Sequence, residues 1–269
     1  MTALVHRLIF VLTVLAAIPA RAVGPDDMID ARILTGWRQS DGRHVAALQF
    51  TLHDGWKTYW RAPGDAGIPP RFDWGASSNL RDSAITWPAP EVIMQSGVRT
   101  IGFTEQVTLP LTLSPDDPDR PIALSGKLDI GVCKEVCVPV SLHVSARLPA
   151  DAADRDPRIV AALASQPLSA DEAGVGQVRC RLSPRDDGLG LRAEIRMPPV
   201  GGREMVIVEA DDPDVWLAQP RVERKGEWLV AETEMAHVDG RAFGVNRSGL
   251  RITVLGHGRA VDIRGCPAP

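Results

Sequence analysis

Residues 127–140 read KLDIGVCKEVCVPV, and this stretch indicates how the chain folds. Apolar residues stand at every second position on each side of two cysteines: Leu128, Ile130, Val132, Val138 and Val140. Because strand side chains alternate between two faces, this spacing predicts two half-buried strands. Cys133 and Cys137 then lie where the first strand turns into the second. The segment therefore predicts an antiparallel hairpin with both cysteines near its tip.

The same alternation recurs along most of the chain. We expect further strands at residues 44–52, 107–113, 138–144, 189–197, 204–208, 228–235 and 250–255. The 24 glycines and 22 prolines supply the turns between them. Pro110 interrupts one strand and, since proline cannot donate to a sheet ladder, predicts a sheet edge or a bulge there. The pattern predicts an all-β protein built of antiparallel sandwiches.

One helix is expected between residues 150 and 170. Asp156 can cap its N-terminus, Pro157 suits its first position, and its apolar stripe is Ile159, Val160 and Leu163. The residues around it are rich in Ala, Asp and Gly, a composition typical of linkers. We therefore predict two immunoglobulin-like β-sandwich domains at 23–148 and 178–269, joined by a linker at 149–177 that contains this short helix.

The first 22 residues predict export. His6 and Arg7 precede an apolar run from Leu8 to Ile18, and Ala20-Arg21-Ala22 is a small-x-small cleavage pattern. These are the parts of a signal peptide, cleaved after Ala22, and the run is far shorter than the ~20 residues that span a bilayer. The charge is balanced, with 30 Lys and Arg against 34 Asp and Glu and no basic run, which argues against a nucleic-acid partner.

The spacing of Cys133 and Cys137 is informative in an exported protein, where disulfides persist. Four extended residues would separate their Cα atoms by about 13 Å, whereas a disulfide needs roughly 4.4–6.8 Å, so the chain must turn between them. A bridge over so short a loop stabilises the fold less than a long one, which favours a redox role. A structural disulfide and a metal site that recruits His143 remain alternatives.

Cys180 and Cys266 enclose the predicted second domain. A bond between them would close a loop of 86 residues, which is worth about 4–5 kcal/mol in the chain-entropy model. Long-loop closure of this kind is typical of a structural staple, and we predict a structural disulfide here rather than a second redox pair.

The cysteine hairpin resembles that of the N-terminal periplasmic domain of the thiol:disulfide interchange protein DsbD family, especially its ScsB-like branch. Residues 54–60 (DGWKTYW) are similar to the family's Asp-Gly-aromatic strand, 107–111 (VTLPL) to its later Leu-Pro strand, and 60–67 (WRAPGDAG) to the ScsB-like branch. The chain departs from the best-known members in two ways. Its cysteines are closer together, and residues 94–99 lack the acidic and aromatic residues of the family's cap loop.

The resemblance implies that Cys133 and Cys137 are the exchanging pair of a protein-disulfide reductase module in the periplasm. Its expected partners are a membrane-embedded electron donor and periplasmic thioredoxin-fold proteins, and the exchange needs no small cofactor. Two other hypotheses use the same residues. One is a non-enzymatic, disulfide-stabilised binding or assembly module of the envelope, and the weaker one is a copper-binding protein.

Overall fold

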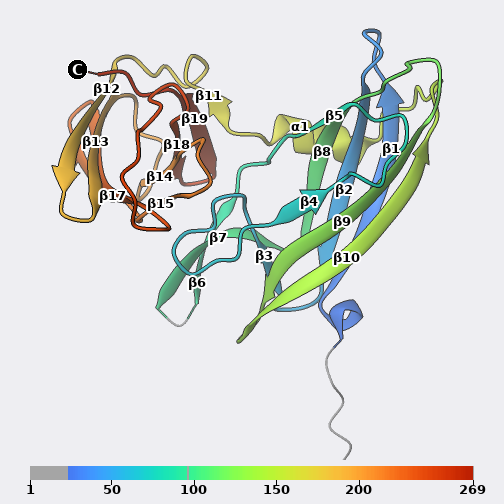
Figure 1. Ribbon diagram of the computed structural model, residues 1–269, viewed down its shortest axis with the longest axis horizontal. Helices are drawn as coiled ribbons and strands as arrows, with labels where there is room; N and C mark the ends of the chain where they lie inside the picture. The colour runs from blue at the N-terminus through green and yellow to red at the C-terminus, as the bar shows by residue number, and fades with distance from the viewer. Residues whose placement is uncertain (1–23, 96, 269) are drawn as a thin grey trace, which may run out of the picture.

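The computed structural model describes residues 24–95 and 97–268. The predicted signal peptide and its cleavage site lie outside these residues. Within them, antiparallel strands predominate and there is one short α-helix, so the predicted all-β class is confirmed. No helix in these two ranges is long and apolar enough to cross a membrane. Figure 1 shows two bodies of packed sheets, the first formed by β1–β10 and the second by β11–β19.

The first sandwich follows a short 3₁₀ turn, η1 (Pro25–Asp27), and consists of two facing sheets. One runs in the order β1 (Ile29–Arg38), β2 (His44–Leu52), β8 (Gln106–Ser114) and β5 (Asp82–Ile85). The other runs in the order β10 (Cys137–Leu148), β9 (Ile122–Cys133), β3 (Lys57–Tyr59), β7 (Val98–Thr104) and β6 (Glu91–Gln95), and β4 (Arg71–Asp73) also pairs with β9. Alternate side chains of β2, β8 and β9 fill the space between the sheets and form most of its core.

The second sandwich has the same two-layer construction. One sheet runs in the order β11 (Leu168–Ser169), β19 (Arg259–Arg264), β18 (Arg251–Gly256) and β14 (Met205–Glu209). The other runs in the order β12 (Val178–Arg185), β13 (Gly188–Arg196), β17 (Trp228–His237) and β15 (Val215–Leu217), and β16 (Arg221–Lys225) also pairs with β17. The single parallel pairing described is that of β11 with β19.

The prediction that Pro110 marks a sheet edge or bulge is wrong. Pro110 lies in β8, which is an internal strand between β2 and β5, and it pairs with Ala47 in regular register. Its carbonyl accepts a hydrogen bond from Thr86, just past the last residue of β5. Since the N and O of one residue point to the same side of an antiparallel strand, Pro110 lacks only the return bond to Thr86, at the place where the ladder with β5 ends.

The expected helix is present as α1 (Pro157–Ala164). Asp156 caps it by accepting a hydrogen bond from the backbone N–H of Arg158, and Pro157 occupies the first turn. Ile159 is fully buried against a cluster on the outer face of the first sheet: Leu34, Trp37, Val45 and Ala47. The residues expected to form a linker therefore pack as ordered structure, with α1 on the first sandwich and β11 in the second.

Ile159→Ala is expected to lower the free energy of unfolding by about 2–5 kcal/mol, because it leaves a cavity between α1 and β2. Val160 stands next to it but is exposed. Val160→Ala is the matched control and should change stability by no more than about 0.5 kcal/mol. Urea unfolding of both variants measures the difference, and equal losses would contradict this packing.

Arg61 joins the two sandwiches. It follows Trp60, which comes directly after the last residue of β3. Its guanidinium makes a two-pronged ion pair with Glu209 of β14, each N–O distance being 2.9 Å. It also donates to Thr253 Oγ1 at 3.3 Å and lies 3.7 Å from the centre of the Trp60 ring. Paired carboxylate contacts of this kind are strong and directional, so the second sandwich is anchored close to the strand that carries Tyr59.

Candidate functional site

The two hairpin cysteines lie directly opposite each other at the end of β9 and β10. These strands pair over twelve residues each, from Ile122↔Leu148 to Cys133↔Cys137. The loop between them is Lys134-Glu135-Val136, and the Lys134 N–H lies 3.4 Å from the Val136 carbonyl. The Cα atoms of the cysteines are 4.1 Å apart and their sulfurs are bonded. The expected turn and hairpin are thus present.

The two cysteines differ sharply in exposure. Cys133 is only 3% exposed, because β9 is flanked on both sides by β10 and β3. Cys137 belongs to β10, the edge strand of that sheet, and is exposed. The bond therefore joins an exposed residue, Cys137, to an enclosed one, Cys133. The sequence alone could not distinguish them, because the difference depends on which strand forms the sheet edge.

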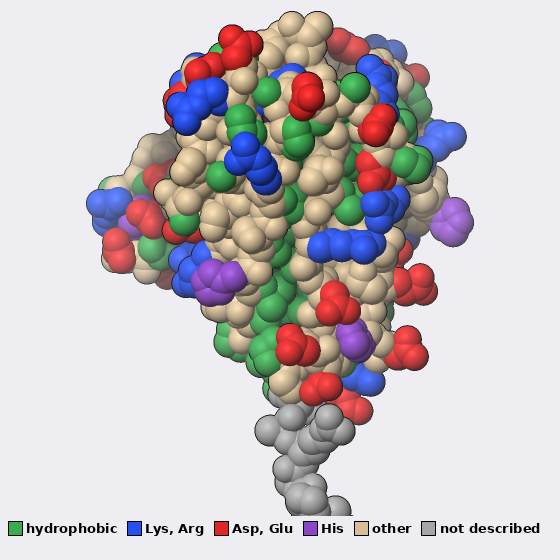
Figure 2. All heavy atoms as spheres, turned by 90° about the vertical axis from the view of Figure 1, so that its right-hand side faces the viewer, with side chains coloured by type: hydrophobic (Ala, Val, Ile, Leu, Met, Phe, Trp, Pro, Cys, Tyr) green, Lys and Arg blue, Asp and Glu red, His purple; other side chains and the backbone are tan. Residues whose placement is uncertain are grey.

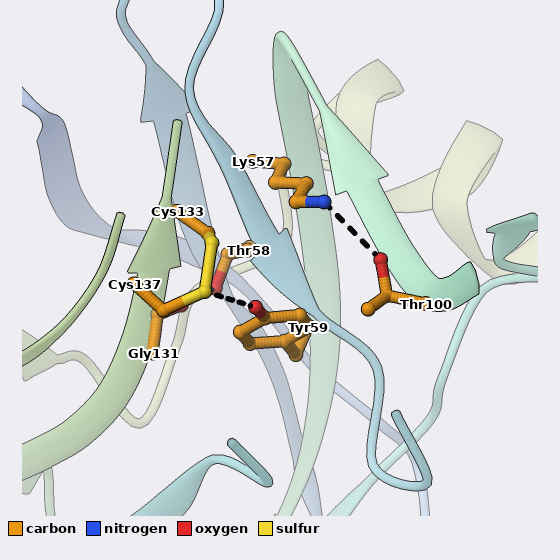
Figure 3. Close-up of a disulfide and its surroundings, with 7 residues drawn as sticks. All are labelled: Lys57, Thr58, Tyr59, Thr100, Gly131, Cys133 and Cys137. Carbon is orange, nitrogen blue, oxygen red and sulfur yellow. Dashed lines mark hydrogen bonds between the residues drawn. A yellow bond between two sulfur atoms is a disulfide. The ribbon is translucent and has the colours of Figure 1, made fainter. Parts of the chain in front are cut away.

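Tyr59 is the polar partner of the exposed cysteine (Figure 3). Its hydroxyl lies 3.0 Å from Cys137 Sγ, and since a disulfide sulfur carries no proton, the hydroxyl is the donor. The residue is 2% exposed, and this burial raises the pKa of the phenol above its usual value. Tyr59 therefore keeps its proton at neutral pH and can donate it to a sulfur acceptor.

Two glycines make room for the Tyr59 ring. A Cβ on Gly131 would lie 2.8 Å from a ring carbon of Tyr59 and 2.7 Å from Cβ of Ile68. A Cβ on Gly67 would lie 3.1 Å from the same ring and 2.2 Å from Pro63. The segment after β3 thus folds back over the ring and shields it from solvent. This covering depends on Gly67, the last residue of the WRAPGDAG stretch.

Apolar side chains surround this end of the sandwich. The hairpin of β6 and β7 carries three exposed ones, Val92, Met94 and Val98, and Val136 in the cysteine loop is 71% exposed. An open groove beside the β6–β7 hairpin is lined by residues 51–57, Ile93, Met94 and 104–106. The stretch 94–99, which lacks the acidic and aromatic residues of a cap loop, is the tip of this β6–β7 hairpin. Ser96 lies outside the described residues.

Figure 2 views the first sandwich from the side of its edge strands β1 and β10. Hydrophobic side chains gather in a strip in the lower half of this face, with charged side chains around it. Half-buried apolar residues of both edge strands pack against the core: Ala31, Ile33, Val138 and Leu142. The strand that begins at Cys137 therefore presents a partly apolar edge.

The geometry disfavours a metal site that uses His143. His143 is six residues along β10 from Cys137, which is about 20 Å in an extended strand. Within residues 24–95 and 97–268, no group of three or more His, Cys, Asp or Glu is placed to hold a metal ion. The two thiols of the hairpin would need donors from elsewhere.

The other two cysteines are bonded to each other in the second sandwich. Cys180 and Cys266 are both essentially inaccessible, and their Cα atoms are 5.4 Å apart. The backbone around them is also linked, since the N–H of Cys180 donates to the carbonyl of Pro267 at 2.8 Å. This bond holds the last strand region to β12 and is closed to solvent.

Tyr59 is a site residue that the sequence patterns do not single out. A signal was present in the alternation of residues 57–59. Lys57 and Tyr59 share one face of β3, and that strand pairs with β9 at Cys133. Only the pairing of the strands shows that this face is the one that carries the cysteines.

Comparison with known proteins agrees with the observed fold. Residues 30–149 match the family described as thiol:disulfide interchange protein DsbD, N-terminal. Among solved structures, the fold is similar to the N-terminal periplasmic domain of ScsB from Proteus mirabilis, with a TM-score of 0.66 and 22% identity over 92% of this chain and 96% of that one. A search of curated proteins finds no match. The match identifies residues 30–149 as a DsbD-family N-terminal domain.

Proposed function

We propose that this protein is exported to the periplasm and relays reducing equivalents through Cys133 and Cys137. It would receive them from a membrane electron transporter and pass them to thioredoxin-fold proteins. The observation that carries the proposal is the asymmetry of the disulfide. Cys137 is exposed on an edge strand and touches the Tyr59 hydroxyl, whereas Cys133 is enclosed. Exchange through a mixed disulfide needs one reachable sulfur and one protected resolving sulfur.

From the unequal exposure of the two cysteines we infer the order of the steps. In the reduced protein, the Cys137 thiolate attacks one sulfur of the partner's disulfide, and the partner's other sulfur leaves as a thiolate. The Cys133 thiolate then attacks Cys137 Sγ, which re-forms the Cys133–Cys137 bond and releases the second partner sulfur. The partner gains two electrons and takes up two protons, and the protein loses two electrons. The membrane donor would reduce the bond again.

The surroundings of the site fit a protein partner. Exposed Val136, Met94 and Val98 would be covered when another protein docks at the hairpin tip. The alternative of a purely structural bond is less well supported, because a loop of three residues restrains little of the unfolded chain. The buried Cys180–Cys266 bond already provides a long-range restraint.

The reduction potential of the Cys133–Cys137 bond tests the proposal. Equilibration of the purified protein with glutathione or dithiothreitol buffers, followed by thiol labelling and mass spectrometry, gives this value. An exchange site should lie in the range of periplasmic and thioredoxin-like couples, above about −300 mV. A potential well below that limit would show a structural bond and end the proposal. The Cys180–Cys266 bond serves as the internal control and should resist reduction.

Tyr59→Phe is expected to make Cys137 less reactive, because it removes the hydroxyl that donates to Sγ but keeps the ring. A hydrogen bond to a charged group is worth about 1.5 kcal/mol or more, so the alkylation rate at pH 7 should fall roughly tenfold. The pH profile of iodoacetamide alkylation, measured with Cys133→Ala present in both proteins, checks this. Identical profiles would show that the hydroxyl has no influence on the thiolate.

A further inference from the structure

Lys57 lies directly opposite the enclosed cysteine. In the ladder between β3 and β9 its register partner is Cys133, so the two side chains leave the sheet on the same face. Opposed residues of neighbouring strands have Cβ atoms about 4.5–5.5 Å apart. Lys57 is only 5% exposed. A lysine buried to this degree is rare unless an anion accompanies it.

The amine of Lys57 has a single neutral partner in the described part of the chain. Nζ donates to Thr100 Oγ1 at 3.3 Å, and Thr100 is itself 3% exposed. None of the ion pairs among the described residues includes Lys57. Desolvation by burial lowers the pKa of Lys57 below its ordinary value. A buried ammonium with three donors and one acceptor is thus left without a counter-charge while the disulfide is closed.

The other ionisable groups around Cys133 are already engaged or exposed. Lys134 donates to the carbonyl of Asp54 at 2.9 Å, and Glu91 accepts from Thr104 Oγ1 at 3.2 Å. Tyr59 is engaged with Cys137. The remaining groups on the adjoining loops are exposed: His53, Asp54, Glu105 and Glu135. Among the described residues, Lys57 is the buried cation on the strand that pairs with β9 at Cys133, and its amine is turned toward Thr100 on β7.

We propose that Lys57 supplies the positive charge that stabilises the thiolate of Cys133 when the pair is reduced. The proposal rests on the proposed exchange function. It gives each of two residues of β3 one of the two sulfurs to stabilise. Tyr59 supports the partner-facing sulfur and Lys57 supports the resolving one. Figure 3 shows both side chains on β3 beside the disulfide, with the Lys57 amine directed toward Thr100 while the bond is closed.

The burial of Cys133 explains why such a charge is needed. A thiolate enclosed to 3% exposure cannot be stabilised by water, so without a nearby cation Cys133 would stay protonated and could not resolve the mixed disulfide. The resolving step breaks the Cys137–partner bond, forms the Cys133–Cys137 bond, and sends the partner's sulfur away as a thiolate that takes a proton from water. Lys57 keeps its own proton throughout.

Reaction with dithiobis(nitrobenzoic acid) separates the two steps, because each attack releases one coloured thiolate. Lys57→Met should leave the first release unchanged and slow the second about tenfold at pH 7, with the rate recovering as the pH rises. In a Cys137→Ala background, thiolate absorbance near 240 nm should show about tenfold less Cys133 thiolate at pH 7 in Lys57→Met.

Thr100→Val is the matched control. It removes the hydrogen bond of the amine but keeps the charge, so it should not slow the second release or reduce the thiolate fraction. Lys127→Met removes an exposed cation six residues away on β9 and should have no effect. If Thr100→Val slows resolution as much as Lys57→Met, the buried network acts structurally and the proposal is wrong.

The outcomes also separate this inference from the proposed function. If the reduced wild-type protein fails to release either coloured thiolate, the exchange function itself is rejected. If the wild type and Lys57→Met resolve at the same rate at every pH, only the role of Lys57 is rejected. Circular dichroism and thermal unfolding establish that each variant is folded, and Lys57→Gln, which keeps a polar end group without charge, should behave like Lys57→Met.

Discussion

Cys137→Ser is expected to abolish exchange with disulfide-bonded thioredoxin-fold proteins, whereas Cys133→Ser is expected to stop the reaction at a stable mixed disulfide. The reason is the unequal exposure of the two sulfurs, since Cys137 is open on the edge strand and Cys133 is 3% exposed. Without Cys137 no reachable nucleophile is left, and without Cys133 the covalent intermediate has no resolving thiolate.

Non-reducing electrophoresis and mass spectrometry of the reduced variants, each mixed with an oxidised thioredoxin-fold protein, provide the measurement. The cross-linked peptide from Cys133→Ser should contain Cys137. The double variant Cys133→Ser/Cys137→Ser sets the background, because it retains the closed Cys180–Cys266 bond as its only disulfide. Trapping by Cys137→Ser instead of Cys133→Ser would reverse the roles and contradict the assignment from exposure.

Removal of the second disulfide by Cys180→Ala/Cys266→Ala is expected to cost about 4–5 kcal/mol of unfolding free energy. The bond closes 86 residues, and in the chain-entropy model the loss of this restraint stabilises the unfolded state by that amount. The hairpin bond spans a sequence separation of only four residues, so its removal by Cys133→Ala/Cys137→Ala should cost less, roughly 2 kcal/mol.

Denaturant unfolding under non-reducing conditions compares the two double variants with the wild type. The second sandwich should unfold first when its own bond is removed, which a separate transition followed by Trp216 and Trp228 fluorescence would reveal. A larger loss at the hairpin than at Cys180–Cys266 would show that the assigned roles of the two bonds are exchanged.

The ion pair between Arg61 and Glu209 links the second sandwich to the surroundings of the hairpin disulfide. Arg61 follows β3 by two residues and is held by Glu209 of the second sandwich. The segment that begins at Arg61 folds over Tyr59, which in turn contacts Cys137. The second sandwich therefore anchors the start of the segment that shields Tyr59, the polar partner of Cys137.

The sequence alone predicted the elements whose signals are local. The alternation of apolar residues identified β2 at residues 44–52 and the hairpin of β9 and β10, because half-buried strands need a period of two. Asp156 and Pro157 identified the start of α1, because capping involves only neighbouring residues. The short spacing of Cys133 and Cys137 predicted a turn, because a disulfide between them forms only if the chain reverses within those few residues.

The tertiary structure decided what depends on strand order. Pro110 is tolerated in an internal strand because the ladder with β5 ends beside it. The expected linker is ordered because Ile159 packs against apolar side chains on the outer face of the first sheet. Cys137 is the exposed cysteine because β10 is an edge strand. Tyr59 and Lys57 lie on the side of the pair where β3 neighbours β9. The sequence by itself determined a two-cysteine hairpin in an all-β chain. Long-range strand pairing, which no local pattern encodes, determined how the two cysteines differ.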